Sequence, residues 1–65
     1  MDYEPLYKRI EQRLRPGDPS VTAQAVATMF GCSESHARDT LEWMARQPAP
    51  KLSAVPGSKP KQWQP

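Results

Sequence analysis

The residues best suited to chemistry in this chain lie between Cys32 and Arg38. Cys32 and His36 are four residues apart, a spacing that two metal ligands or a Cys–His catalytic pair can use. The chain has no other Cys or His, whereas a zinc site needs three or four ligands and a catalytic pair needs an orienting group and a pocket. We therefore predict that Cys32 is a small core residue. We also predict no metal, no cofactor, no small-molecule substrate and no enzymatic activity.

Polar side chains of the same segment have a second kind of chemistry available to them. Hydroxyl, imidazole and guanidinium groups near the start of a helix can hydrogen-bond to base edges and phosphates of duplex DNA. The simpler alternative is a polar helix face that contacts only water. The candidate DNA contacts in this segment are Ser33, Ser35, His36 and Arg38.

The segment before these residues predicts a helix over residues 23–30. Thr22 suits the N-cap position, and Gly31 suits the helix end because glycine adopts a positive φ without a Cβ clash. The apolar positions of this helix are Ala23, Val26, Ala27 and Phe30. We expect Phe30 to be buried between the helices.

A tight turn then leads to a further helix over residues 34–46, with Ser33 as its N-cap. The prolines that follow, Pro48 and Pro50, end this helix. Its apolar stripe has i, i+4, i+7 spacing and consists of Ala37, Leu41 and Met44. Trp43 lies off the stripe, and we expect it to be partly buried against the C-terminal hairpin or the N-terminal helix. The alternative is an exposed Trp43, which would indicate a protein interface.

The N-terminal part of the chain predicts one more helix, over residues 4–14, with Pro5 in its first turn. The sequence Arg-Pro-Gly-Asp-Pro over residues 15–19 is typical of a turn and ends it. Its apolar stripe consists of Tyr3, Leu6, Tyr7, Ile10 and Leu14. The basic side chains on its other face are interpreted as a solvated surface, with flanking phosphate contacts as the alternative.

The C-terminal residues 51–64 are too rich in proline for a helix and predict a two-stranded β-hairpin. Pro56 and Gly57 have the types that a type II turn needs, so we expect a four-residue loop over residues 56–59. That loop would place Leu52 opposite Trp63, with both side chains toward the helices.

The hairpin also carries a group of cations, Lys51, Lys59 and Lys61. A lysine at a hairpin tip can bind the phosphate backbone of DNA. It can equally keep an edge strand from pairing with other chains. We count these three lysines among the candidate DNA contacts.

Size and charge limit the function classes. The chain has 65 residues, close to the smallest size at which one hydrophobic core folds alone. Nine basic residues against seven acidic ones give a net charge of +2, which allows nucleic-acid binding but does not by itself indicate it. No stretch is apolar enough to span a membrane, and the N-terminus lacks the features of a signal peptide, so a cytoplasmic protein is expected.

The turn between the two central helices resembles a known pattern. The segment Gly31-Cys32-Ser33-x-Ser35-x-Ala37-Arg38-x-x-Leu41 resembles the G-V-S-x-x-T-V-R-x-x-L core of GntR-type bacterial winged-helix regulators. The small size, the opening Thr-Ala-x-x-Val-Ala and Trp63 in the second hairpin strand are also similar to the FaeA/PapI-type regulators. This resemblance implies a mainly α fold with a small β-hairpin: a three-helix helix-turn-helix core followed by a two-stranded wing.

The resemblance implies a small bacterial or phage transcriptional regulator that binds duplex DNA. The helix over 34–46 would enter the major groove, and the hairpin tip would follow the backbone. The alternative is a winged helix that binds a host or phage protein, as an inhibitor or an adaptor would. Acidic residues on the same helix favour this alternative, namely Glu34, Asp39 and Glu42.

Overall fold

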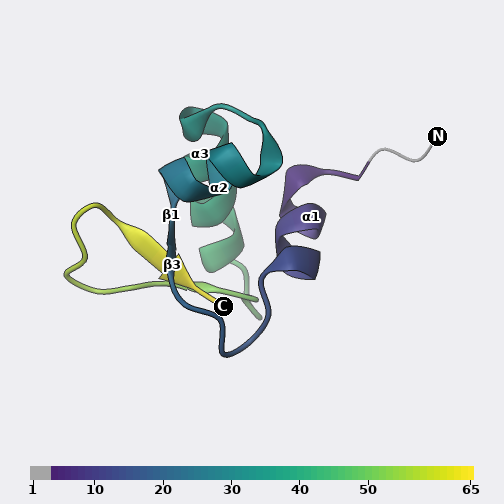
Figure 1. The fold of residues 1–65 in the computed structure, drawn as a ribbon. Helices are drawn as coiled ribbons and strands as arrows, with labels where there is room; N and C mark the ends of the chain where they lie inside the picture. Colours follow the sequence, from purple (N-terminus) through teal and green to yellow (C-terminus); the bar gives the residue numbers. More distant parts are fainter. Residues whose placement is uncertain (1–3) are drawn as a thin grey trace.

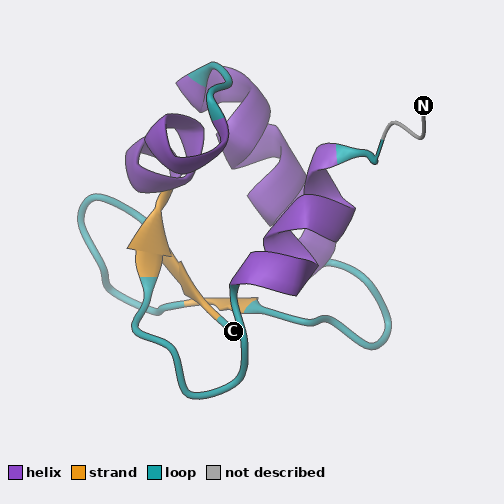
Figure 2. Cartoon of the chain, turned by 45° about the vertical axis from the view of Figure 1, so that its right-hand side comes forward, coloured by secondary structure: helices purple, strands orange, loops and turns teal. Residues whose placement is uncertain are grey.

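Three helices form one half of this computed structural model, which describes residues 4–65, and a small antiparallel sheet forms the other half (Figure 1). The helices are α1 (Leu6–Arg13), α2 (Ala23–Phe30) and α3 (Glu34–Ala45). The strands are β1 (Val21–Thr22), β2 (Ser53–Ala54) and β3 (Gln62–Gln64). Figure 2 shows the helices grouped on one side of the molecule and the strands beneath them.

The hydrophobic core lies where the helices meet the sheet. The four largest fully buried side chains come from all three helices and from β3; they are Ile10, Val26, Leu41 and Trp63. The remaining buried apolar residues are Leu6, Ala23, Ala27, Ala37, Met44 and Leu52. Because most of these side chains are small or medium-sized, the core depends on the close approach of α2 and α3.

The first helix of the central pair forms as the sequence predicts. Helix α2 has the predicted bounds, and the Thr22 hydroxyl accepts a hydrogen bond from the Ala25 N–H at 3.1 Å. Its C-cap, Gly31, adopts φ +68°, and the next N–H, that of Cys32, donates to the Ala27 carbonyl at 3.0 Å. These two contacts satisfy helix-end groups that would otherwise lack a partner.

Helices α1 and α3 are shorter than predicted. Helix α1 starts at Leu6 because Pro5 is extended, with ψ 158°, and it ends at Arg13 because Leu14 is extended as well. Helix α3 ends at Ala45, one residue before the predicted end. The predicted contribution of Tyr3 to the stripe of α1 lies outside the described residues.

The sheet contains a strand that the sequence did not predict. Strand β1 immediately precedes α2 and pairs with β3, so the strand order is β1-β3-β2 and β3 is central. The Ser20 hydroxyl and the Gln62 side chain also hydrogen-bond at 2.6 Å beside this pairing. A strand of two residues is too short to show the alternation of apolar and polar residues that predicts strands, so the sequence did not indicate β1.

The predicted hairpin register is wrong. Ala54, not Leu52, lies opposite Trp63, so the connection between the paired strands is longer than four residues. The Ser58 hydroxyl accounts for the longer connection: it donates to the Val55 carbonyl at 2.8 Å and accepts from the Gln62 N–H at 2.9 Å. The shift is two residues, which keeps the same face inward, and both Leu52 and Trp63 are buried as expected.

Two predictions of burial need correction. Phe30 is only partly buried, because it is the last residue of α2 and lies at the edge of the core. The Arg9 guanidinium covers its ring, with the guanidinium carbon 5.3 Å from the ring centroid. Trp43 is 45% exposed, although its ring packs on Tyr7. Cys32 is partly buried and packs against the core.

Candidate nucleic-acid interface

The N-terminal end of α3 is fixed by its cap. The Ser33 hydroxyl accepts a hydrogen bond from the His36 N–H at 3.2 Å, and the Ser33 carbonyl accepts one from the Ala37 N–H at 3.0 Å. Ser33 was a candidate DNA contact, and the structure gives its oxygen atoms a role in starting the helix. The first turn of α3 is therefore held in position on the outside of the molecule.

The two sides of α3 differ sharply in chemistry. Its inward side carries the buried residues Ala37, Leu41 and Met44. At 100° per residue, the side opposite this stripe carries Ser35, Asp39 and Glu42. Two of these three outward residues are acidic, so the middle of the exposed face would repel phosphates.

Arg38 lies at one edge of the exposed face of α3. Its guanidinium Nη2 contacts Glu34 Oε1 at 3.0 Å, one helical turn earlier, and both side chains are about half exposed. An exposed pair of this kind contributes only about 0.3–0.5 kcal/mol, so either partner is easily recruited by another charge. Arg38 is thus available to an incoming phosphate or base.

A small hollow beside Arg38 brings three elements together. We call it the loop hollow; its volume is about 90 Å³. Arg38 and Glu34 come from α3, Lys61 from the connection between β2 and β3, and Gln24 from the first turn of α2. The remaining lining residues are Thr22, Ala23, Pro60 and Trp63. The structure therefore places Arg38 and Lys61, which are far apart in the sequence, on one surface.

Lys61 is held on this surface by two contacts. Its ammonium lies 3.6 Å from Glu42 Oε1 and 5.4 Å from the ring centroid of Trp63. The side chain is 53% exposed, so the cation remains open to solvent on one side. The Trp63 ring forms a cation–π contact with the Lys61 ammonium, and the same ring is buried in the hydrophobic core.

The connection between β2 and β3 projects away from the helices (Figure 1). Gly57 adopts φ +73° there, as the turn prediction requires, and Lys59 follows on an exposed stretch. The predicted basic group is only partly assembled, however. Lys51 lies on a different surface, in a hollow that it shares with Glu11 and Arg15 near the end of α1.

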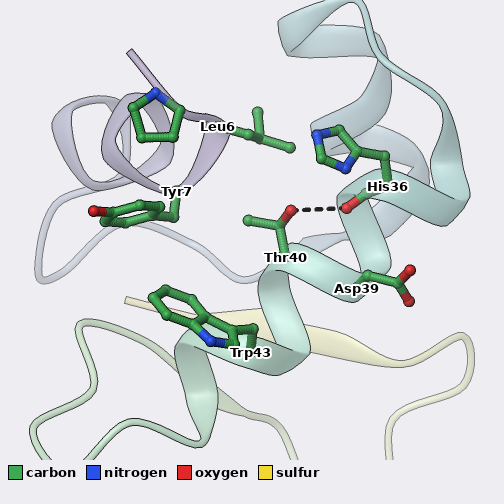
Figure 3. A pocket seen from close by; sticks show the side chains of 7 residues that line it. Leu6, Tyr7, His36, Asp39, Thr40 and Trp43 are labelled. Atoms are coloured by element: carbon green, nitrogen blue, oxygen red, sulfur yellow. Dashed lines mark hydrogen bonds between the residues drawn. The ribbon is translucent and has the colours of Figure 1, made fainter.

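His36 lies on the opposite side of α3 from Arg38. Figure 3 shows its imidazole directed toward Leu6, in an apolar hollow between α1 and α3. We call this site the aromatic hollow; its other labelled lining residues are Tyr7, Asp39, Thr40 and Trp43. The predicted DNA contacts of α3 are therefore divided between two sides of the helix, and only Ser35 and Arg38 lie on or next to its outward side.

Sequence reasoning missed three residues that shape these surfaces. Gln24 is a polar residue on a largely apolar helix, and Ser58 lies in a turn, where serine is common, so neither position gives a functional signal. Tyr7 was assigned to the α1 stripe, yet it packs on Trp43 with the ring centroids 5.1 Å apart. The i, i+4 rule compares residues within one helix, so it gave no signal for a contact between two helices.

Comparisons with known proteins place no further constraint on the site. The chain matches no protein-family model, no curated protein sequence and no solved structure. Within residues 4–65, no three His, Cys, Asp or Glu side chains are grouped as metal ligands would be. None of the described helices has the length and apolar character that a membrane crossing requires.

Proposed function

We propose that this protein is a small winged helix that binds duplex DNA as a transcriptional regulator. In this proposal α2 and α3 are the helix-turn-helix, and the connection between β2 and β3 is the wing. The exposed first half of α3 enters the major groove, and the wing follows the phosphate backbone. Helix α1 and the buried face of the sheet support these two parts.

The observation that carries the proposal is the loop hollow. Arg38, Lys61 and Gln24 come from three different elements, and all three border this one surface. A surface with guanidinium, ammonium and amide donors side by side suits the phosphates and base edges of a duplex. Lys59, on the same connection as Lys61, extends the positive charge along the wing.

The acidic residues of α3 define how the duplex is contacted. Asp39 and Glu42 face outward in the middle and second half of the helix, where they oppose close contact with phosphates. Ser35 and Arg38 lie in the first half, where the acid nearest to Arg38, Glu34, is paired with it at 3.0 Å. The proposal therefore assigns DNA contact to the N-terminal end of α3 together with the wing, and not to the full length of the helix.

The test is a charge reversal on the proposed contact surface. The double variant Arg38→Glu/Lys59→Glu replaces two cations of this surface with carboxylates and leaves the core unchanged. We expect its affinity for duplex DNA to fall by more than about tenfold at low salt, a loss of at least about 1.4 kcal/mol in binding free energy. Fluorescence anisotropy with a labelled duplex measures this change.

The matched control is Lys8→Glu/Arg13→Glu, which makes the same change in net charge on exposed residues of α1. We expect this control to bind duplex DNA within a few-fold of wild type. Thermal melts of both variants check the fold, since Glu at position 38 faces Glu34 across one helical turn. Equal losses in the two variants would refute the assigned surface.

A further inference from the structure

The aromatic hollow on the α1 side of α3 has the composition of a binding site for an apolar side chain. Its volume is about 340 Å³, and its walls are formed by Leu6 and Tyr7 of α1 and by Thr40 and Trp43 of α3 (Figure 3). The Thr40 hydroxyl donates to the His36 carbonyl at 2.8 Å, which leaves its methyl group turned toward Tyr7. The interior is thus mostly apolar, and its lining also includes the His36 imidazole and the Asp39 carboxylate.

Trp43 is the most unusual residue of this hollow because it is exposed. Among the described residues, only Met29 and Trp43 are large hydrophobic side chains with more than 40% exposure. The Trp43 ring is nevertheless positioned, since it packs on Tyr7 at 5.1 Å with the two ring planes inclined by 57°. A positioned, exposed tryptophan beside an apolar hollow is typical of a protein-binding surface.

Charge on α3 indicates the chemistry of the partner. Glu34 pairs with Arg38 and Glu42 pairs with Lys61. Asp39, at the rim of the aromatic hollow, is the one carboxylate of α3 with no ion pair within the described part of the chain, and it is directed outward (Figure 3). An unpaired carboxylate next to an apolar hollow is complementary to a segment that carries an apolar residue beside a cation.

We propose that the aromatic hollow binds a segment of another protein that inserts one large apolar side chain against Tyr7 and Trp43 and places a Lys or Arg beside Asp39. The partner cation gains the Asp39 carboxylate, which is directed away from the Trp43 ring, while the inserted apolar side chain packs on the two aromatic rings (Figure 3). The hollow lies on the opposite side of α3 from Arg38, so this proposal does not depend on DNA binding.

The first part of the test uses a library of short phage-displayed peptides. The library is selected on wild-type protein and counter-selected on the variant Trp43→Ala. We expect the enriched peptides to combine an aromatic residue or leucine with a neighbouring Lys or Arg. The variant Met29→Ala alters the other exposed hydrophobic residue, and it should bind the enriched peptides as wild type does.

The second part exchanges the charges. For one enriched peptide, we expect the protein variant Asp39→Lys to bind about tenfold or more weakly than wild type. A second version of this peptide has its Lys or Arg replaced by Glu, and we expect it to bind Asp39→Lys more tightly than the original peptide does. Glu11→Lys, an equal change at an exposed acid of α1 outside the hollow, should leave binding unchanged. Circular dichroism checks that each variant is folded.

The proposal is overturned if peptides bind wild type and Asp39→Lys equally, or if none is enriched over the Trp43→Ala counter-selection. It is also overturned if sedimentation shows self-association that Trp43→Ala abolishes, since the occupant would then be a second copy of this chain. Binding of duplex DNA that is lost in Asp39→Lys but kept in Arg38→Glu would assign the hollow to nucleic acid instead.

Discussion

Single hydroxyl groups determine where two of the three described helices of this small protein begin. The Thr22 and Ser33 side chains each accept a hydrogen bond from the N–H three residues later, and these contacts start α2 and α3. The Ser58 hydroxyl sets the length of the connection between β2 and β3. In a chain of 65 residues, where total stability is only a few kcal/mol, each such bond is a considerable fraction of the total.

The cap of α3 gives a prediction with a built-in control. Ser33→Ala removes the acceptor of the His36 N–H and should destabilise the protein by about 0.5–2 kcal/mol. Ser35→Ala, two residues later, removes an exposed hydroxyl that makes no hydrogen bond within the described residues and should cost a few tenths of a kcal/mol at most. Urea denaturation followed by circular dichroism measures both. A smaller effect at Ser33 than at Ser35 would contradict the capping role.

A second prediction ranks two apolar residues by burial. Leu41 is fully buried, and Leu41→Ala should cost about 2–5 kcal/mol, enough to leave the domain largely unfolded. Phe30 is partly buried under Arg9, so Phe30→Ala should cost less than the roughly 3–5 kcal/mol typical of a buried phenylalanine. Thermal melts compare the two variants, and a Phe30→Ala protein less stable than Leu41→Ala would show that this ranking is wrong.

At the scale of elements, the turn between α2 and α3 fixes the geometry of the proposed contact surface. Gly31 takes the left-handed conformation that ends α2, and Ser33 starts α3 two residues later. Because the turn is short, the direction of α3 relative to α2 depends on the backbone angles of three residues, Gly31, Cys32 and Ser33, and Gly31 is the one with a positive φ. A substitution at Gly31 therefore changes the position of Arg38 while leaving the Arg38 side chain itself unaltered.

Gly31→Ala tests this dependence. No atom outside the immediate neighbours lies within 4 Å of a Cβ placed there, so the cost is the strain of a positive φ, about 1–2 kcal/mol. Gly31→Asn should cost less, since asparagine tolerates this conformation better than alanine. Thermal denaturation of the two variants gives the comparison. Equal stability of Gly31→Ala and wild type would contradict the observed turn.

The elements also show what the sequence was able to predict. Local signals determined α2, its Thr22 cap, the Gly31 turn and the inward side of α3, because these depend on residues a few positions apart. The third strand and the hairpin register were not predictable in this way. Strand β1 exists only because β3 pairs with it, and the register depends on Ser58 bonding to two backbone groups.

The candidate site was predicted in part for the same reason. Arg38 and Lys61 were both chosen from the sequence, but only the fold shows that they share a surface with Gln24 and that Lys51 does not. The position of His36 on the α1 side of α3 follows from 100° of rotation per residue and was available in principle. The exposure of Trp43 could not be predicted from the sequence, since it depends on how far α1 covers α3.

At the scale of the whole molecule, two different surfaces lie on the two sides of α3. The cations Arg38, Lys59 and Lys61 lie on the side of the wing, whereas Asp39 and the exposed Trp43 lie toward α1. With a net charge of only +2, long-range attraction to DNA is weak, so the proposed DNA binding has to depend on the local arrangement of these cations. The two proposed surfaces lie on different sides of α3, so the proposals together predict that a protein partner and a duplex can be bound at the same time.

The most direct test of the DNA-binding account is the salt dependence of duplex binding by the wild-type protein. If Arg38, Lys59 and Lys61 neutralise about three phosphates, the logarithm of the association constant should fall against the logarithm of salt concentration with a slope of about −2.7. Fluorescence anisotropy from about 50 to 200 mM salt covers the range in which the fall is measurable. A slope near this value supports the account; binding that is absent at the lowest salt, or that does not change with salt, contradicts it.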